Sequence, residues 1–225
     1  SKAFDYMIYH TSSQKQYYKD QFSWLSSKSE FVLLGVDYEY WKNKIYPGTK
    51  EKNSYIVCVG YRKRDWNTLL KAYNELNIDE ELYLIGKPDI KCENSKIKVL
   101  PFIPISELMT YIVNAKFSVI PLDDFNYSFA QLTLLQQMAL GVPILAADVY
   151  AIRDYIKCSS GVISYIPYDV ENLKIKLQEL SKLKEADLRK MGQSNMECIM
   201  TVLSEQQMAQ RFERICRMLY GGKEG

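Results

Sequence analysis

Two apolar runs joined by a helical stretch constrain the fold of this chain more than any other feature. The first run is Phe117 to Leu122, and the second follows Gly141 and Pro143. Both are rich in valine, isoleucine, leucine and alanine, which is typical of parallel strands covered on both faces. The helical pattern between them begins at about Gln131 and ends at Gly141. Residues 117 to 148 therefore predict a strand, a loop, a helix and a second strand of a parallel sheet.

The predicted helix has an apolar face and a polar face, so it can pack on a sheet. The apolar face contains Leu132, Leu134, Leu135, Met138 and Ala139. The other face contains Thr133, Gln136 and Gln137. A ligand of a parallel sheet lies at the carboxyl ends of the strands. Here that edge is the loop from Asp123 to Ala130 and the first amides of the helix, which suit an anion such as a phosphate.

This stretch resembles the C-terminal, nucleotide-binding domain of GT-B glycosyltransferases of the retaining family-four type, the glycosyl transferases group 1. That family reads roughly Pro-Ser, a short loop, Glu-Gly-Phe-Gly, a few residues, and then Glu-Ala-Met-Ala-x-Gly-x-Pro-Val. Pro121 and the run from Gln136 to Ile144 match this pattern. The family's two glutamates, which contact the donor sugar and the ribose, fall on Ser128 and Gln136. The chain therefore lacks both carboxylates, although an amide can still hydrogen-bond a diol.

The resemblance implies an α/β fold with a Rossmann-like parallel sheet of about six strands and helices on both faces. It also implies a site for a nucleotide-diphosphate sugar, bound as substrate, with no further cofactor and no metal. The residues expected to bind the nucleotide and its phosphates are Gly60, Arg62, Arg64, Ser128, Gln131, Leu132, Thr133 and Gln136. Phe102 and Ile103 are expected to contact the base, with a core position as the alternative for Phe102. No catalytic residue is assigned.

A basic turn follows the predicted strand from Tyr55 to Val59. Its sequence, Gly60-Tyr-Arg-Lys-Arg-Asp-Trp, resembles the family's Gly-Arg-x-x-Lys-Gly turn and places Arg64 at the usual basic position. An arginine there can bind a diphosphate through two parallel hydrogen bonds. Asp65 is a good N-cap for the next helix. The alternative is a solvated basic turn without a ligand.

The first fifty residues resemble the last unit of an N-terminal GT-B domain followed by the linker at 42–53. A strand at Tyr6–Tyr9, a helix at Gln14–Leu25 and a strand at Phe31–Val36 are expected there. We predict three parts: 1–50 as the end of that domain with the linker, 51–200 as the nucleotide-sugar-binding domain, and 201–225 as a C-terminal crossing helix. The alternative is a βαβ extension of a single domain.

The other predicted elements alternate between strands and helices, as in a doubly wound fold. Further strands are expected at Leu82–Ile85, Ile97–Phe102 and Val162–Ile166. Helices are expected at Ile105–Asn114, Val149–Ile156, Asp169–Leu183 and Ala186–Tyr220, the last with breaks near Gly192 and Ser204.

Composition excludes several classes of protein. The net charge of +2, from 29 basic and 27 acidic residues, is too small to indicate nonspecific nucleic-acid binding. Five cysteines without close spacing and a single histidine indicate neither a zinc site nor a disulfide framework, which fits a reducing cytoplasm. Neither the dinucleotide nor the P-loop glycine motif occurs. Asp123 and Asp124 are a weak alternative as magnesium ligands, and no apolar run is long enough to span a membrane.

The sequence therefore predicts the donor-binding part of a glycosyltransferase of polysaccharide biosynthesis. It would transfer a sugar from a nucleotide-diphosphate sugar to a saccharide or lipid-linked acceptor, in the cytoplasm or in peripheral contact with the inner face of the membrane. Because catalytic groups are expected from an N-terminal domain, this chain alone should bind the donor without turnover. The alternatives are a non-catalytic sugar-nucleotide-binding or scaffolding domain and an unrelated Rossmann-like module.

Overall fold

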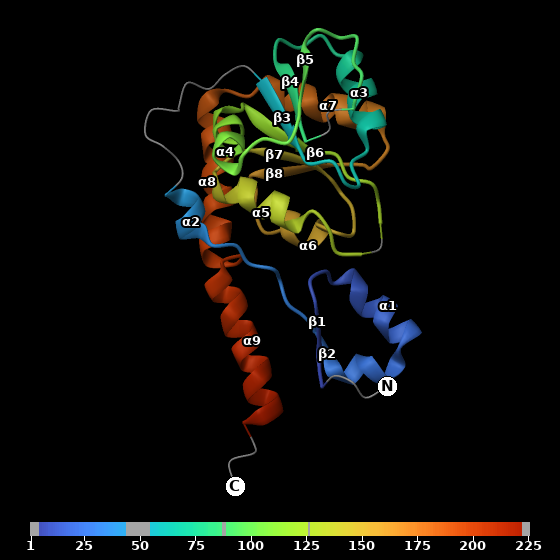
Figure 1. The fold of residues 1–225 in the computed structure, drawn as a ribbon, viewed down its shortest axis with the longest axis vertical. Coiled ribbons are helices and arrows are strands. Elements are labelled where there is room, and N and C mark those ends of the chain that lie inside the picture. Colours follow the sequence, from blue (N-terminus) through green and yellow to red (C-terminus); the bar gives the residue numbers. More distant parts are fainter. Residues whose placement is uncertain (1–4, 44–54, 87–88, 126, 222–225) are drawn as a thin grey trace.

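A six-stranded parallel sheet forms the centre of the computed structural model, which describes residues 5–43, 55–86, 89–125 and 127–221 (Figure 1). Its strands are β3 (Tyr55–Val59), β4 (Glu81–Ile85), β5 (Ile97–Leu100), β6 (Phe117–Ile120), β7 (Ile144–Ala147) and β8 (Val162–Tyr165). Their order is β5-β4-β3-β6-β7-β8, and every neighbouring pair is parallel. The predicted α/β fold class is therefore confirmed.

The strand order reverses between β3 and β6. From β3 the chain moves outward through β4 to β5, and then returns to the other side of β3 to form β6. Loops at the carboxyl ends of β3 and β6 thus diverge to opposite faces, and a crevice opens between them. All four residues of β6 are buried, as the apolar run predicts.

Helices cover both faces of the sheet. In Figure 1, α3 (Trp66–Asn74) and α7 (Val170–Ser181) lie together on one side, while α4 (Ile105–Asn114) and α5 (Gln131–Ala139) lie on the other. The side chain of Asp65 accepts a hydrogen bond from the Thr68 amide, and Asp169 likewise accepts one from Asn172, so two of the aspartates act as N-caps. The bounds of α4 are those predicted.

Helix α5 is packed differently from the helical-wheel prediction. Leu134, Leu135, Met138 and Ala139 are fully buried, but Leu132 is 54% exposed and Gln137 only 1% exposed. The prediction is wrong for both residues: Leu132, in the first turn, is exposed to solvent, and Gln137 is buried because α5 contacts α2 (Tyr38–Lys42) and α8 (Glu185–Thr201). A helix covered on several sides buries residues that a single apolar stripe would leave in solvent.

Helix α8 is continuous through Gly192, where a break was expected. A Cβ atom added at Gly192 would lie 2.1 Å from the carbonyl oxygen of Gly141. The glycine therefore allows close packing of α8 on the end of α5. Three residues further along, the buried Asn195 side chain donates hydrogen bonds to the carbonyl oxygens of Val142 (2.7 Å) and Gly161 (3.2 Å). These bonds fix α8 to the amino ends of β7 and β8.

Residues 5–36 form a small unit with its own two-stranded sheet. It contains β1 (Met7–Tyr9), α1 (Ser13–Gln21), a 3₁₀ helix (Ser23–Lys28) and β2 (Ser29–Phe31), with β1 parallel to β2. The strand predicted at Phe31–Val36 is thus wrong in position: the ladder ends at Phe31, and Val36 instead forms a parallel bridge with Ser204. The chain is extended there because it passes from one sheet to the other.

Two elements attach this small unit to the rest of the chain. Tyr155 of α6 (Arg153–Ile156) donates a hydrogen bond to the His10 carbonyl (2.7 Å) and accepts one from the Leu34 amide (3.0 Å). Helix α9 (Glu205–Tyr220) extends away from the main sheet alongside the small unit, where Arg214 pairs with Glu30 (Figure 1). The break at Ser204 is confirmed. The predicted linker at 42–53 lies almost wholly outside the described residues, and the domain boundaries stay predictions.

Candidate functional site

A pocket of about 480 Å³ lies at the carboxyl edge of the sheet, where β3 and β6 diverge. It is formed by the turn after β3, the loop after β6 and the first turn of α5. Its lining residues are Gly60, Tyr61, Arg62, Lys63, Arg64, Tyr127, Phe129, Ala130 and Thr133. Three consecutive basic residues and no acidic residue are in this set, so the pocket favours an anion.

Arg64 is the most enclosed of the basic residues, with 8% of its surface exposed. Its Nε and Nη2 atoms donate hydrogen bonds to the Val59 carbonyl at 3.2 and 3.0 Å, and Nη1 donates to the Arg62 carbonyl at 3.1 Å. Burial lowers the pKa of Arg64. Three of the five guanidinium N–H groups thus shape the turn itself. Gly60, at φ +104°, is required beside it because an added Cβ would lie 2.6 Å from Nη2.

The turn after β3 is joined to the chain after β6 by backbone bonds. Arg64 and Leu122 form an antiparallel bridge, the Asp65 amide donates to the Pro121 carbonyl (3.0 Å), and the Asp123 amide donates to the Lys63 carbonyl (3.2 Å). Lys63 has a left-handed backbone at φ +52°, and its Nζ lies 3.4 Å from the centre of the Phe125 ring. The two walls of the pocket therefore form one connected structure.

Helix α5 begins without a side-chain cap. The residue before it, Ala130, adopts a left-handed conformation with φ 64° and ψ −2°. Among residues 5–43, 55–86, 89–125 and 127–221, no acceptor contacts the backbone N–H groups of Gln131, Leu132 and Thr133. Open N–H groups at the positive end of a helix are suited to bind a phosphate.

The structure brings together part of the predicted phosphate site. Gly60, Arg62, Arg64 and Thr133 line the pocket, whereas Ser128, Gln131, Leu132 and Gln136 do not. Ser128 and Gln131 lie beside it and are joined by a hydrogen bond of 2.7 Å. Gln136 is half-buried one turn further into α5. The contacts of these residues with a nucleotide stay predictions.

The two residues expected to contact a base lie in different environments. Phe102 is 66% exposed and packs edge-on against Tyr61, with 5.1 Å between ring centres. The alternative that Phe102 belongs to the core is therefore wrong. Ile103 packs against a small buried cluster that includes Tyr55 and Ala115.

Sequence reasoning assigned no individual role to four of the lining residues. They are Tyr61, Tyr127, Phe129 and Ala130, the last three within the loop expected at the ligand edge. Alternating aromatic residues at 125, 127 and 129, between the predicted strand and the predicted helix, were a usable signal because an exposed aromatic loop next to a phosphate site can enclose a ligand. In the structure these rings contact one another at 5.6 and 5.3 Å between centres.

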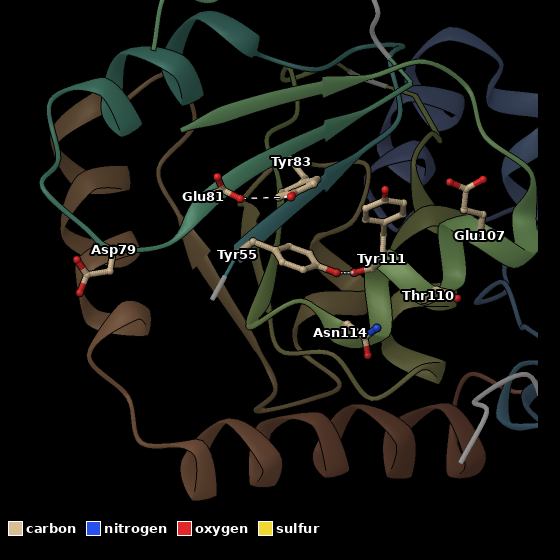
Figure 2. Close-up of a pocket in the computed structure, with 8 residues that line it drawn as sticks. All are labelled: Tyr55, Asp79, Glu81, Tyr83, Glu107, Thr110, Tyr111 and Asn114. Carbon is tan, nitrogen blue, oxygen red and sulfur yellow. Dashed lines mark hydrogen bonds between the residues drawn. The ribbon is translucent and has the colours of Figure 1, made fainter. Parts of the chain in front are cut away.

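A larger pocket, about 700 Å³, lies between the amino-terminal halves of β3 and β4 and helix α4 (Figure 2). It is lined by Tyr55, Asp79, Glu81, Tyr83, Glu107, Thr110, Tyr111 and Asn114. Within it, Tyr55 donates a hydrogen bond to the Tyr111 carbonyl (2.7 Å) and Tyr83 donates one to Glu81 (3.2 Å). Burial and the Glu81 charge raise the pKa of Tyr83. Three carboxylates and no cation line this pocket, so it does not suit a phosphate.

Within the described ranges, no group of three or more histidine, cysteine, aspartate or glutamate side chains is arranged to hold a metal ion. Of the two aspartates considered as magnesium ligands, Asp124 donates its backbone amide to the Tyr168 hydroxyl at 2.7 Å. None of the helices in the described part of the chain is both long enough and apolar enough to cross a membrane.

Comparisons with solved structures place the fold. The chain is similar to sucrose-phosphate synthase from Thermosynechococcus elongatus (TM-score 0.74, 16% identity), covering 96% of this chain and 58% of that one. It is also similar to a glycosyltransferase from Rickettsia africae (TM-score 0.79, 15% identity), covering 98% of this chain and 64% of that one. A third is Anabaena HepE in complex with UDP and glucose (TM-score 0.75, 12% identity), with 96% and 63% covered.

This chain therefore spans less than two thirds of the length of each of these three structures. No curated protein sequence matches it. The sequence profile of the family described as glycosyl transferases group 1 matches residues 53–182, which is more than half of the chain and includes the whole central sheet. The chain belongs to the glycosyl transferases group 1 family.

Proposed function

We propose that this chain is the donor-binding part of a glycosyltransferase that transfers a sugar from a nucleotide-diphosphate sugar to a saccharide or lipid-linked acceptor. One observation carries the proposal: three consecutive basic residues, 62–64, face the uncapped start of α5 in a pocket at the sheet's switch point. Family membership, and the UDP and UDP-glucose held by Anabaena HepE, support a nucleotide sugar as the anion.

The basic residues have different parts in this proposal. The exposed Arg62 and half-buried Lys63 can turn toward a diphosphate, whereas Arg64 keeps the turn in shape and offers its two remaining N–H groups. When the sugar leaves, negative charge grows on the diphosphate. Cationic groups and helix amides already aimed at that position stabilise the charge with little rearrangement. A metal ion is not required by this scheme.

The acceptor and the catalytic groups would come from another domain. The β1–β2 pair supports this part of the proposal, since two strands of three residues are too small for an independent sheet. Tyr17 and Phe22 of the same unit are 45% and 42% exposed, and they offer apolar surface for such a domain. All five cysteines are free, which supports a reducing compartment such as the cytoplasm. A lipid-linked acceptor would bring the protein to the inner face of the membrane.

Binding is tested with UDP, GDP, ADP, CMP and inorganic pyrophosphate in thermal-shift and calorimetric titrations. At one hundred times Kd, a ligand should stabilise the folded chain by about 2.7 kcal/mol. We expect at least one of the nucleoside diphosphates UDP, GDP and ADP to bind. Glu107→Ala, in the acidic pocket, serves as the matched control and should leave this binding unchanged. A chain that binds none of these ligands would contradict the proposal.

Turnover is tested separately with radiolabelled nucleotide sugars and a pool of saccharide and lipid acceptors. The 225-residue chain should bind without transfer, because half an active site lacks the proximity that contributes several powers of ten to the rate. A chain extended at its N-terminus should transfer the sugar. Robust transfer by the short chain would overturn the two-domain account.

A second candidate function follows from Ser128 and Gln136, which replace both family glutamates. A non-catalytic sugar-nucleotide-binding or scaffolding domain would not need those carboxylates. Nucleotide binding by both chains, with transfer by neither, would favour this alternative.

A further inference from the structure

We infer that Gln131 is the positioning residue of the diphosphate site: its side-chain amide holds the Ser128 loop and the first turn of α5 in their binding shape and leaves the Ser128 hydroxyl free to donate. The inference rests on the proposed function of the same pocket. It concerns a side chain that does not itself line that pocket.

Gln131 is an unusual first residue for a helix at the edge of a sheet. It is 5% exposed, whereas the next residue, Leu132, is 54% exposed. A buried amide is costly unless its N–H and C=O groups find partners. The position therefore requires specific acceptors nearby, and an apolar residue would satisfy burial more simply.

Two acceptors meet the amide nitrogen of Gln131. Its Nε2 lies 2.7 Å from Ser128 Oγ and 2.7 Å from the Ala151 carbonyl oxygen. A carbonyl oxygen can only accept, so the nitrogen of the side chain must face Ala151. Both amide protons are then used. Because the Ser128 oxygen accepts one of them, its own proton is directed elsewhere and is available to a ligand.

The segment held in this way is strained. Ala130 lies between Ser128 and the helix with φ 64°, in the left-handed region that is unfavourable for a residue with a Cβ atom. Ala130 and its neighbour Phe129 line the pocket. Such strain persists only where the surroundings fix it, and it concentrates at functional sites. One bond of Gln131 reaches Ser128, two residues before Ala130. The other reaches Ala151, in the segment after β7, so Ala130 is held between fixed points.

The same helix provides a matched comparison. Gln137 is 1% exposed, and neither its Nε2 nor its Oε1 has a hydrogen-bond partner among the described residues. Two buried glutamines of the same helix thus differ in whether the amide holds another part of the chain. Replacement by methionine, similar in length and apolar, removes the amide from either position.

The test uses the full chain, with UDP, UMP and inorganic pyrophosphate as probes in calorimetric titrations. Gln131→Met should weaken UDP and pyrophosphate binding by about tenfold, and UMP binding by less than about threefold. Gln137→Met should bind all three probes as the wild type does. Gln131→Glu should resemble Gln131→Met, because a carboxylate accepts the Ser128 proton and repels the Ala151 carbonyl.

The readouts separate positioning from general stability. A merely structural role would lower the melting temperature of Gln131→Met and leave the ratio of UDP to UMP affinity unchanged. Urea unfolding gives the stability of each variant, and titrations are made where each is folded. If Gln131→Met does not fold, Gln131→Glu and Ser128→Ala carry the test. Both should lower the ratio of UDP affinity to UMP affinity to the same extent.

The outcomes distinguish this inference from the proposed function. If the wild type binds UDP and the Gln131 variants keep the same ratio of UDP affinity to UMP affinity, the inference is overturned and the proposed function stands. Absence of binding by the wild type to UDP, GDP, ADP and pyrophosphate overturns both. A lowered ratio in the Gln131 variants, with Gln137→Met unaffected, supports the assignment.

Discussion

The two edges of the central sheet use charged residues in opposite ways. At the amino edge, the Glu80 carboxylate receives hydrogen bonds from Lys116 Nζ and Ser181 Oγ, and Tyr73 donates to the Glu80 carbonyl. At the carboxyl edge, no carboxylate among the described residues forms an ion pair with Arg62 or Lys63. At the amino edge the buried Glu80 charge is thus neutralised, while the carboxyl edge keeps cationic groups open.

The charged residues of the amino edge stabilise the fold, whereas those of the carboxyl edge line the candidate site. Glu80 and Lys116 precede β4 and β6, so their bonds fasten strand starts to the end of α7. The carboxyl edge instead carries left-handed backbone at Lys63 and Ala130 and a helix start without a cap. Unfavourable local features of this kind are kept where binding compensates for them.

The largest expected effect is at the amino edge. Glu80→Ala should lower the free energy of unfolding by about 3 kcal/mol, because Lys116 would be left partly buried without its carboxylate. UDP affinity should not change. Urea unfolding and calorimetry measure the two quantities, and Glu75→Ala, which removes a solvent-exposed pair with Lys174, is the control expected to change stability little. A large loss of UDP affinity in Glu80→Ala would contradict the separation of the two edges.

Arg64→Ala should affect both stability and binding, because its guanidinium belongs to the turn and to the pocket. We expect the free energy of unfolding to fall by about 2 kcal/mol, since the carbonyls of Val59 and Arg62 lose the donors that the buried Arg64 side chain supplies. Chemical denaturation measures this effect. Unchanged stability would mean that the guanidinium is not held by the turn.

Arg62→Ala should separate binding from folding. Arg62 is exposed, so the free energy of unfolding should change by less than about 0.5 kcal/mol. UDP affinity should fall by about tenfold, or about 1.4 kcal/mol, through the loss of one charge-assisted contact. Calorimetric titration of UDP measures it. Equal affinity of variant and wild type would remove Arg62 from the site.

The smallest effect is a pH dependence at the amino edge. Burial would raise the pKa of Glu80, but hydrogen bonds from Lys116 and Ser181 outweigh it and hold the pKa below its ordinary value of 4.5. The stabilisation is therefore present above pH 4.5 and is lost as the pH falls below it through the folded-state pKa. In denaturation series from pH 7 to pH 3, Glu80→Gln should lose less stability than the wild type. Parallel curves would show that Glu80 does not contribute to acid sensitivity.

The sheet and most helices could be predicted because their apolar patterns are local. The runs at Phe117 and after Pro143 gave β6 and β7, and the helix at Ile105–Asn114 was predicted with its observed bounds. Gly192 shows where local rules fail, since its role depends on Gly141, 51 residues earlier in the chain. The environments of Leu132 and Gln137 likewise depend on helices that pack onto α5 from elsewhere.

Part of the predicted site could be brought together from the sequence. Family resemblance and the switch-point rule point to the edge where β3 and β6 diverge, and Gly60, Arg62, Arg64 and Thr133 line a pocket there. A sequence does not show that the Arg64 guanidinium turns back onto Val59, because that direction follows from the bridge between Arg64 and Leu122. The bond from Gln131 to Ala151 has the same origin, in a contact between separate segments.

The bridge between Val36 and Ser204 has a consequence for the order in which the protein folds. These residues are 168 positions apart, and Arg214 of α9 pairs with Glu30 of the small unit. At 5–20 residues per second, the ribosome needs roughly ten to thirty seconds to make the intervening chain. The small unit can form its hydrogen bonds with Tyr155 once α6 has been made, but the Val36–Ser204 bridge and the Arg214–Glu30 pair must wait until α9 emerges. Between these two points the unit is held by α6 and not yet by α9.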